Sequence, residues 1–221
     1  MNADSVDEDM GAPYVLPMFP LEHAIVPSMV VPLHIFEPRY RAFARDLHTA
    51  DEATFGVVGI ERGREVGGQD QRFDVGVVMQ LLAAEEFPDG RWALTSVASR
   101  RLSVVEWLTD DPYPRAMVVD RLDDLTAGPP NAEERAALTT EFGRLAETVR
   151  RLQPQVDLLA APSSADDEDW RAWELVGRAG LGSLDHVSLL GCDDPAERVR
   201  RASQLIADRR DLLDALAGGD R

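Results

Sequence analysis

Apolar and polar positions alternate with two different periods along the chain. Between residues 14 and 124 the period is close to two, which is typical of strands whose successive side chains point to opposite faces. The clearest run of this kind occupies alternate positions at Phe73, Val75, Val77, Met79 and Leu81. A turn follows at Asp89-Gly90, where glycine can adopt a positive φ. A returning strand is predicted from Trp92 to about Leu108.

Four further extended runs are predicted, at residues 14–21, 29–36, 54–60 and 115–122. Pro17 and Pro20 restrict the first run to an edge strand or a bent one, because proline has no amide hydrogen to donate. One helix interrupts the strands. Pro38 suits a first helical turn, and the apolar residues that follow it at helical spacing are Tyr40, Phe43, Ala44 and Leu47. The pattern predicts a helix over residues 38–50.

The period becomes helical after the turn-rich segment Ala127-Gly128-Pro129-Pro130. Spacings of three and four predict one apolar helix face made of Leu138, Phe142, Leu145, Val149 and Leu152. Asn131 is predicted to cap this helix at its N-terminus. Further helices are predicted around Trp170 and Trp173, and from Pro195 to about Ala217.

These patterns predict an α+β protein in which a β-rich domain precedes a helical one. The expected boundaries are a disordered acidic tail at residues 1–13, a β domain at 14–124, a linker at 125–132 and a helical domain at 133–217. The glycine-rich segment at residues 63–68 is interpreted as a flexible connection, because it lacks the G-x-G-x-x-G order of a dinucleotide-binding loop.

The charge of the chain excludes several functions. A formal net charge of −17, from 40 acidic and 23 basic residues, argues against binding to nucleic acid or to an anionic membrane, since both are bound largely through Lys and Arg. All 23 basic residues are arginine. A chain without lysine cannot form a G-x-x-x-x-G-K-[ST] phosphate loop or a Ser–Lys dyad. The cluster Arg200, Arg201, Arg209 and Arg210 is interpreted as a solvated helix face in preference to a basic patch.

Residue spacing in the sequence predicts neither catalysis nor a metal site. The histidines have no further ligands at metal-site spacing; they are His23, His34, His48 and His186. Cys192 is interpreted as a buried thiol, and Asp185, His186 and Ser188 lie too close in sequence to form a hydrolase triad. We predict no catalytic residue, no cofactor and no metal. The single cysteine and the lack of a signal peptide or membrane span predict a cytoplasmic protein.

The run from Val31 to Phe36 is the candidate binding segment. Alternation places Val31, Leu33 and Ile35 on one side of a strand, with His34 and Phe36 on the other. One set belongs to the core, and the other is either covered by the helical domain or lines a groove. His34 and Phe36 are therefore the predicted binding residues, and a metal-ligand role for His34 is disfavoured.

Several motifs resemble the Lon protease N-terminal domain family, and its small stand-alone bacterial members above all. The opening signature is Leu16-Pro17-Met18-Phe19-Pro20-Leu21, Val26-Pro27 and Val31-Pro32-Leu33-His34-Ile35-Phe36-Glu37-Pro38-Arg39-Tyr40. The later motifs follow in the family's order: Phe55-Gly56-Val57-Val58, Glu65-Val66-Gly67, Asp74-Val75-Gly76, Asp89-Gly90-Arg91, Arg100-Arg101-Leu102 and Pro112-Tyr113-Pro114. The match covers residues 14–124. Ser28 and Ala98 depart from it, because they stand where the family commonly has glycine.

The resemblance implies a PUA-like β pseudo-barrel followed by helices, and a non-catalytic module for substrate recognition or adaptor function. Its partners would be unfolded or exposed apolar polypeptide segments, and a protease or a chaperone, without nucleic acid or membrane. The ATPase and the Ser–Lys peptidase of full-length Lon both need a lysine, so these residues encode neither. Glu37, Arg39 and Tyr40 are interpreted as structural. A small-ligand or RNA-binding PUA-like module is the alternative function, and an unrecognised enzyme is the third.

Overall fold

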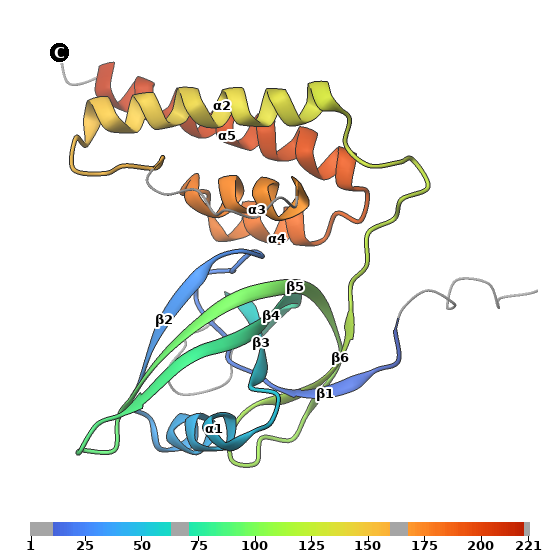
Figure 1. The fold of residues 1–221 in the computed structure, drawn as a ribbon, viewed down its shortest axis with the longest axis vertical. Helices are drawn as coiled ribbons and strands as arrows, with labels where there is room; N and C mark the ends of the chain where they lie inside the picture. The colour runs from blue at the N-terminus through green and yellow to red at the C-terminus, as the bar shows by residue number, and fades with distance from the viewer. Residues whose placement is uncertain (1–10, 63–70, 160–167, 219–221) are drawn as a thin grey trace, which may run out of the picture. The chain divides into compact units, whose positions relative to one another are not determined.

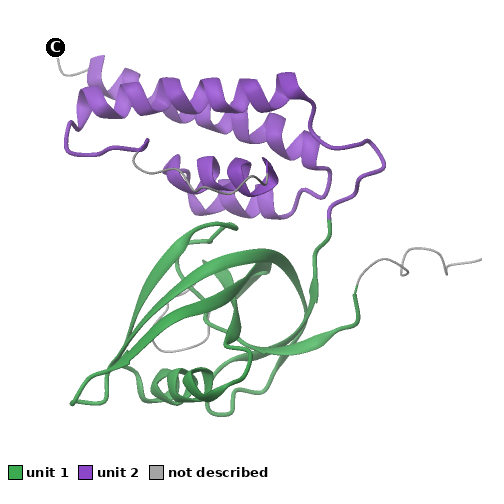
Figure 2. Ribbon diagram, viewed as in Figure 1, with its two compact units in different colours: residues 1–122 green, residues 123–221 purple. Residues whose placement is uncertain are grey.

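The structure is a computed structural model that describes residues 11–62, 71–159 and 168–218. The chain divides into two compact units, Met1–Leu122 and Asp123–Arg221 (Figure 2). Most of the predicted acidic tail and the predicted flexible connection at residues 63–68 lie outside the described residues. The domain boundaries derived from the sequence stay predictions.

The described residues of unit 1 form a six-stranded sheet and one helix (Figure 1). The strands are β1 (Tyr14–Pro17), β2 (Val30–Ile35), β3 (Thr54–Arg62), β4 (Gln71–Glu86), β5 (Trp92–Leu108) and β6 (Arg115–Asp120), and the helix is α1 (Pro38–Thr49). The strand order is β1-β6-β5-β4-β3, and β2 also pairs with β5. The long strand β5 therefore has two partners on one edge, β2 along its first half and β6 along its second half.

A change of partner at the end of β1 closes this sheet into a pseudo-barrel. The Met18 amide still donates to the Pro114 carbonyl beside β6, at 2.8 Å, but the next amide, that of Phe19, donates to Gly56 of β3 at the same distance. Met18 and Leu21 form parallel bridges with β3. The chain thus joins the two outer strands of the sheet order, and most strand edges are removed from solvent.

Two glycines permit close approaches at the closure and beside it. A Cβ atom on Gly56 would lie 2.4 Å from the Met18 sulfur, and one on Gly76 would lie 2.1 Å from the carbonyl oxygen of Val57. Neither distance is compatible with a side chain unless the neighbour moves. Since Gly56 and Gly76 lie on the neighbouring strands β3 and β4, they allow the close backbone approach that the barrel needs.

Helix α1 closes one end of the barrel through aromatic packing (Figure 1). The Phe43 ring meets those of Phe55 and Tyr113 edge-on, at centroid distances of 5.2 and 5.4 Å, a geometry that aromatic pairs prefer. Phe19 and Tyr40 extend the cluster, 4.4 Å apart. The helix predicted at residues 38–50 is confirmed within one residue, as is the burial of its apolar face.

Unit 2 contains four helices in its described residues, namely α2 (Ala132–Leu152), α3 (Glu168–Arg178), α4 (Ser183–Leu190) and α5 (Pro195–Gly218). Helices α2 and α5 lie side by side (Figure 1). The predicted cap is confirmed, since the Asn131 side chain accepts from the Glu133 and Glu134 amides and Glu134 returns a bond to the Asn131 amide. Among the helices described here, none is long and apolar enough to cross a bilayer.

The close approach at Gly76 predicts that a Gly→Ala change there has the opposite effect to the same change at the open helical position Gly143. Gly76→Ala should lower the free energy of unfolding by about 1–3 kcal/mol, because the new methyl group overlaps the β3 backbone. Gly143→Ala should raise it by about 0.5–1 kcal/mol, because Gly143 is an exposed α2 position with open space around it. Urea unfolding of both variants measures the difference. Equal stability of the wild type and Gly76→Ala would contradict the assigned close approach.

The departure from the family pattern at Ser28 also has a measurable cost. Ser28 has a φ of 74°, a left-handed conformation that glycine adopts more readily than serine. Ser28→Gly relieves this backbone strain, but glycine also has more conformational freedom in the unfolded chain, which offsets part of the gain. The net effect should be a rise of about 0.5–1 kcal/mol in the free energy of unfolding. The matched change Ser203→Gly, within α5, should lower it by about 0.5 kcal/mol. Thermal unfolding that shifts both variants in the same direction would refute the explanation.

Candidate functional site

One face of the sheet in unit 1 is open to solvent where β2, β5 and β4 pair. Three cross-strand rows lie on it, one residue from each strand: Val30, Val97 and Gln80; Pro32, Thr95 and Ala83; and His34, Ala93 and Glu85. These nine residues are called the outer face. All of them are exposed or half-buried, while the alternate residues Leu33 and Leu94 are in the core. The surface follows directly from the strand register.

Large apolar side chains are exposed on and beside the outer face. Val30 is 58% exposed, and Phe36, which follows β2, is 55% exposed. Leu82 is 57% exposed and is the extra residue where the β4–β5 register shifts. The backbone beneath Phe36 is fixed, because Arg41 donates from Nε to its carbonyl oxygen at 2.9 Å. Exposed apolar groups that are grouped in this way are typical of binding surfaces.

The outer face continues into a pocket of about 710 Å³. Its lining residues are Tyr14, Val15, Leu16 and Pro17 of β1, Asp46 and Leu47 of α1, Ala50, Asp51 and Glu52 of the following connection, and Thr54, Gln80 and Arg100 of the other strands. We call this the β1 pocket. Gln80 belongs both to the pocket and to the outer face, so the two are continuous.

The pocket exists because β1 and β3 separate. Their parallel pairing begins at Met18 and Gly56, and the residues before it that line the pocket are Tyr14 to Pro17 of β1 and Thr54 of β3. The closure therefore leaves one opening in the barrel wall.

Arg100 is neutralised at the pocket wall. Its Nε donates to Oδ2 of Asp120 at 2.7 Å, and its NH2 group donates to the Tyr14 hydroxyl at 3.1 Å. The Tyr14 hydroxyl donates in turn to Oδ1 of Asp120 at 2.5 Å. Burial raises the pKa of Tyr14, and the hydrogen bond to Asp120 acts in the same direction. Although burial alone would lower the pKa of Arg100, its hydrogen bond to Asp120 raises it above the usual value.

Asp46 connects the pocket to the aromatic cluster. Its Oδ2 accepts from the Tyr113 hydroxyl at 2.7 Å. Burial, followed by this hydrogen bond and the carboxylate charge, raises the pKa of Tyr113 to about 12. The interaction fixes one Asp46 oxygen and ties the Pro112-Tyr113-Pro114 segment to α1.

The sequence model described as the ATP-dependent protease La (LON) substrate-binding domain matches residues 15–208. The chain belongs to this Lon family. Two curated relatives are the Lon protease of Trichlorobacter lovleyi, 22% identical over 221 residues, and Lon protease 2 of Herpetosiphon aurantiacus, 25% identical over 214 residues. These matches cover 96% and 95% of the chain but 26% of each relative, so the chain spans about a quarter of their length.

Solved Lon domains share the fold. A Lon N-terminal domain protein from Xanthomonas campestris is 24% identical with a TM-score of 0.57, covering 88% of this chain and 98% of its own. The N-terminal domain of a Mycobacterium avium complex Lon protease is 16% identical with a TM-score of 0.56, covering 88% and 99%. The resemblance drawn from the sequence motifs and the expected α+β, PUA-like class are thereby confirmed.

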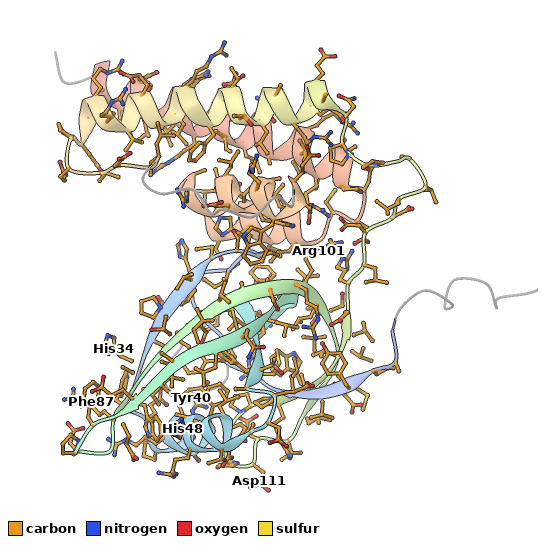
Figure 3. All side chains as sticks on the ribbon, in the orientation of Figure 1. His34, Tyr40, His48, Phe87, Arg101 and Asp111 are labelled. Carbon is orange, nitrogen blue, oxygen red and sulfur yellow. The ribbon has the colours of Figure 1, made fainter. Side chains whose placement is uncertain are left out.

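The structure places both predicted binding residues of this Lon-family chain at the solvent-facing surface. His34 lies in the outer face, and its side chain points away from the barrel (Figure 3). The predicted alternation is confirmed, since Leu33 and Ile35 are buried while His34 and Phe36 are exposed. A binding role for His34 and Phe36 stays a prediction. Glu37 and Arg39 form an ion pair, with Arg39 Nε 3.2 Å from Glu37 Oε2.

The other residues that the sequence singled out lie outside the outer face and the β1 pocket. Cys192 and His186 are buried. The ring centroids of His48 and Trp92 lie 5.5 Å apart. Across residues 11–62, 71–159 and 168–218, no group of three or more His, Cys, Asp or Glu side chains could hold a metal ion. Arg200 pairs with Glu134 and Glu197, and Arg210 pairs with Glu141 and Asp211.

The β1 pocket was missed by the sequence interpretation. It combines the first strand, the end of α1 and Arg100, and Arg100 lies 86 positions from its hydrogen-bond partner Tyr14. The available signal was the Arg100-Arg101-Leu102 motif, which the family resemblance contained but to which no role was assigned. The acidic pair Asp51 and Glu52 carries no motif and becomes notable only once β1 is placed opposite it.

The Tyr113–Asp46 pair predicts a tyrosine that ionises late. Its raised pKa, about 12, means that neutral Tyr113 contributes stability that is complete below the unfolded value of 10 and is lost as the pH rises through about 12. Phenolate absorbance of the wild type minus that of Tyr113→Phe isolates this titration, and circular dichroism at each pH reports whether the barrel remains folded. Asp46→Asn should lower the midpoint. A midpoint near 10 in the folded wild type would contradict the assignment.

Proposed function

We propose that this chain is a non-catalytic module that binds exposed apolar segments of polypeptides on its outer face. The observation that carries the proposal is the continuity of that face, with Val30, Phe36 and Leu82 more than half exposed and neighbouring strands in fixed register. Membership of the Lon substrate-binding family supports a polypeptide as the partner. A protease or a chaperone that receives the bound chain is a further partner within this proposal.

The composition of the outer face suits an unfolded partner. It offers apolar and small side chains that can pack against many sequences, together with His34, Glu85 and Gln80 as polar contacts. Exposed apolar groups of an unfolded chain lose water on this surface, which is the main favourable contribution to such binding. RNA is disfavoured as a ligand because the net charge is −17 and the β1 pocket contains three carboxylates.

Binding can be measured by fluorescence anisotropy with labelled ribonuclease that has been reduced and carbamidomethylated, so that it stays unfolded without added charge. Phe36→Ser, Val30→Ser and Leu82→Ser should each weaken binding by roughly 3–10-fold, because each removes an apolar contact. Their free energies of unfolding should stay within about 0.5 kcal/mol of the wild type, since the side chains are exposed. His34→Ala tests the second predicted residue in the same assay.

Val105→Ser is the matched control, because Val105 is 55% exposed but lies outside the outer face. It should bind as the wild type does. The native, disulfide-bonded ribonuclease should not bind. If Val105→Ser weakened binding as much as Val30→Ser, or if a triple variant that combines Val30→Ser, Phe36→Ser and Leu82→Ser bound normally, the proposed surface would be wrong.

A further inference from the structure

We propose that the β1 pocket binds the cationic side chain of an arginine or lysine in the same polypeptide whose apolar segment lies on the outer face. This inference rests on the proposed function and specifies its substrate class, a polypeptide segment in which a basic residue precedes or follows an apolar stretch.

The first support is charge complementarity. Three carboxylates line the pocket, those of Asp46, Asp51 and Glu52, and the single lining cation, Arg100, is already paired with Asp120. Within the described part of the chain, the Asp51 and Glu52 side chains have neither a hydrogen bond nor an ion pair. The pocket thus offers unpaired acceptors to a cation, and charge-assisted hydrogen bonds to carboxylates are among the strong ones.

The second support is the shape of the pocket below those carboxylates. Its floor includes Leu16 and Leu47, which are 4% and 3% exposed. A long basic side chain has an apolar methylene stem and a charged end, so it can place the stem against this floor while the end reaches the carboxylates. A small hydrated cation would not use the apolar part of the pocket.

The third support is the free edge of β1. Because the Met18 amide bonds to Pro114 and hydrogen bonding alternates along an antiparallel pair, the backbone groups of Tyr14 and Leu16 also face β6. Those of Val15 and Pro17 then face the opposite edge, which lines the pocket. The Val15 amide and carbonyl can therefore hold one residue of an extended polypeptide, the backbone contact used in strand addition.

The distance between pocket and outer face sets the spacing in the ligand. From Val97, in the same row as Gln80, to Ala93, in the same row as His34, the outer face runs four residues along β5. At about 3.4 Å per residue this is about 14 Å. An extended ligand therefore has its basic residue about four positions or fewer from the apolar side chains that contact the outer face.

The probe is a fluorescein-labelled ten-residue peptide. Valine alternates with threonine in its apolar segment, and one arginine stands four positions from that segment. A second peptide replaces arginine by citrulline, which keeps the size and the amide-type hydrogen bonding but has no charge. Wild-type protein should bind the arginine peptide on the order of tenfold more tightly than the citrulline peptide, and the difference should shrink as salt is raised.

The variant Asp51→Asn with Glu52→Gln should abolish this preference and leave binding of the citrulline peptide unchanged. The control variant, Asp74→Asn with Glu106→Gln, makes the same change of net charge at two exposed carboxylates outside the pocket. It should keep the full preference for arginine, which separates a local pocket from the general acidity of the chain.

The two proposals fail differently. If both peptides bind equally well to the wild type, the pocket proposal is wrong while polypeptide binding stands. If neither peptide nor the unfolded ribonuclease binds, both proposals are wrong. If spermidine displaces the arginine peptide at equal concentration, the pocket binds a free cation, and its assignment to a polypeptide side chain is wrong.

Discussion

Residues Met18 to Leu21 leave β6 and pair with β3, and this exchange of hydrogen-bond partners determines what unit 1 can present to solvent. The exchange joins the two ends of the strand order, so the main chain is satisfied almost all the way around. It depends on a close approach that Gly56 permits, because the Met18 side chain occupies the space of a Cβ atom there. The same crossing leaves the first residues of β1 without a second neighbour, which is where the β1 pocket lies.

The surroundings of one face of β4 change between Val78 and Gln80. Val78 lies in the barrel core with Leu102 and Met18, whereas Gln80, on the same side, is exposed. The same face of β4 therefore lines the barrel core at Val78 and belongs to the outer face at Gln80. A ligand bound to the outer face as proposed would lie against a hydrogen-bonded framework, because β4 and β5 pair along the whole of that face.

Local patterns were enough to predict the elements whose signals are periodic. The alternation along β4, the α1 stripe and the Asn131 cap each depend on residues a few positions apart, and the strand, the helix and the cap are each confirmed. Helix α4 was missed, because its eight residues, Ser183–Leu190, make only about two turns, too few to show a helical period. The β1 pocket could not be predicted, since it depends on which strands become neighbours.

The relation between Ser28 and Ala98, the two residues that stand where the family commonly has glycine, also could not be predicted from local patterns. They are distant in sequence, yet the Ser28 amide donates to the Ala98 carbonyl at 2.8 Å, so the two departures from the family pattern face each other.

The prolines of the opening segment have a consequence for the proposed binding of unfolded chains. β2 is paired on one side only, with β5, and an open strand edge can recruit further strands without limit, as in amyloid growth. Pro32 lies within that edge strand and supplies no amide hydrogen. On β1, Pro17 has the same effect beside Val15. Under the proposed function, a captured polypeptide would be held at single points and could not be extended into a growing sheet, so the module would contact aggregation-prone segments without becoming a template for them.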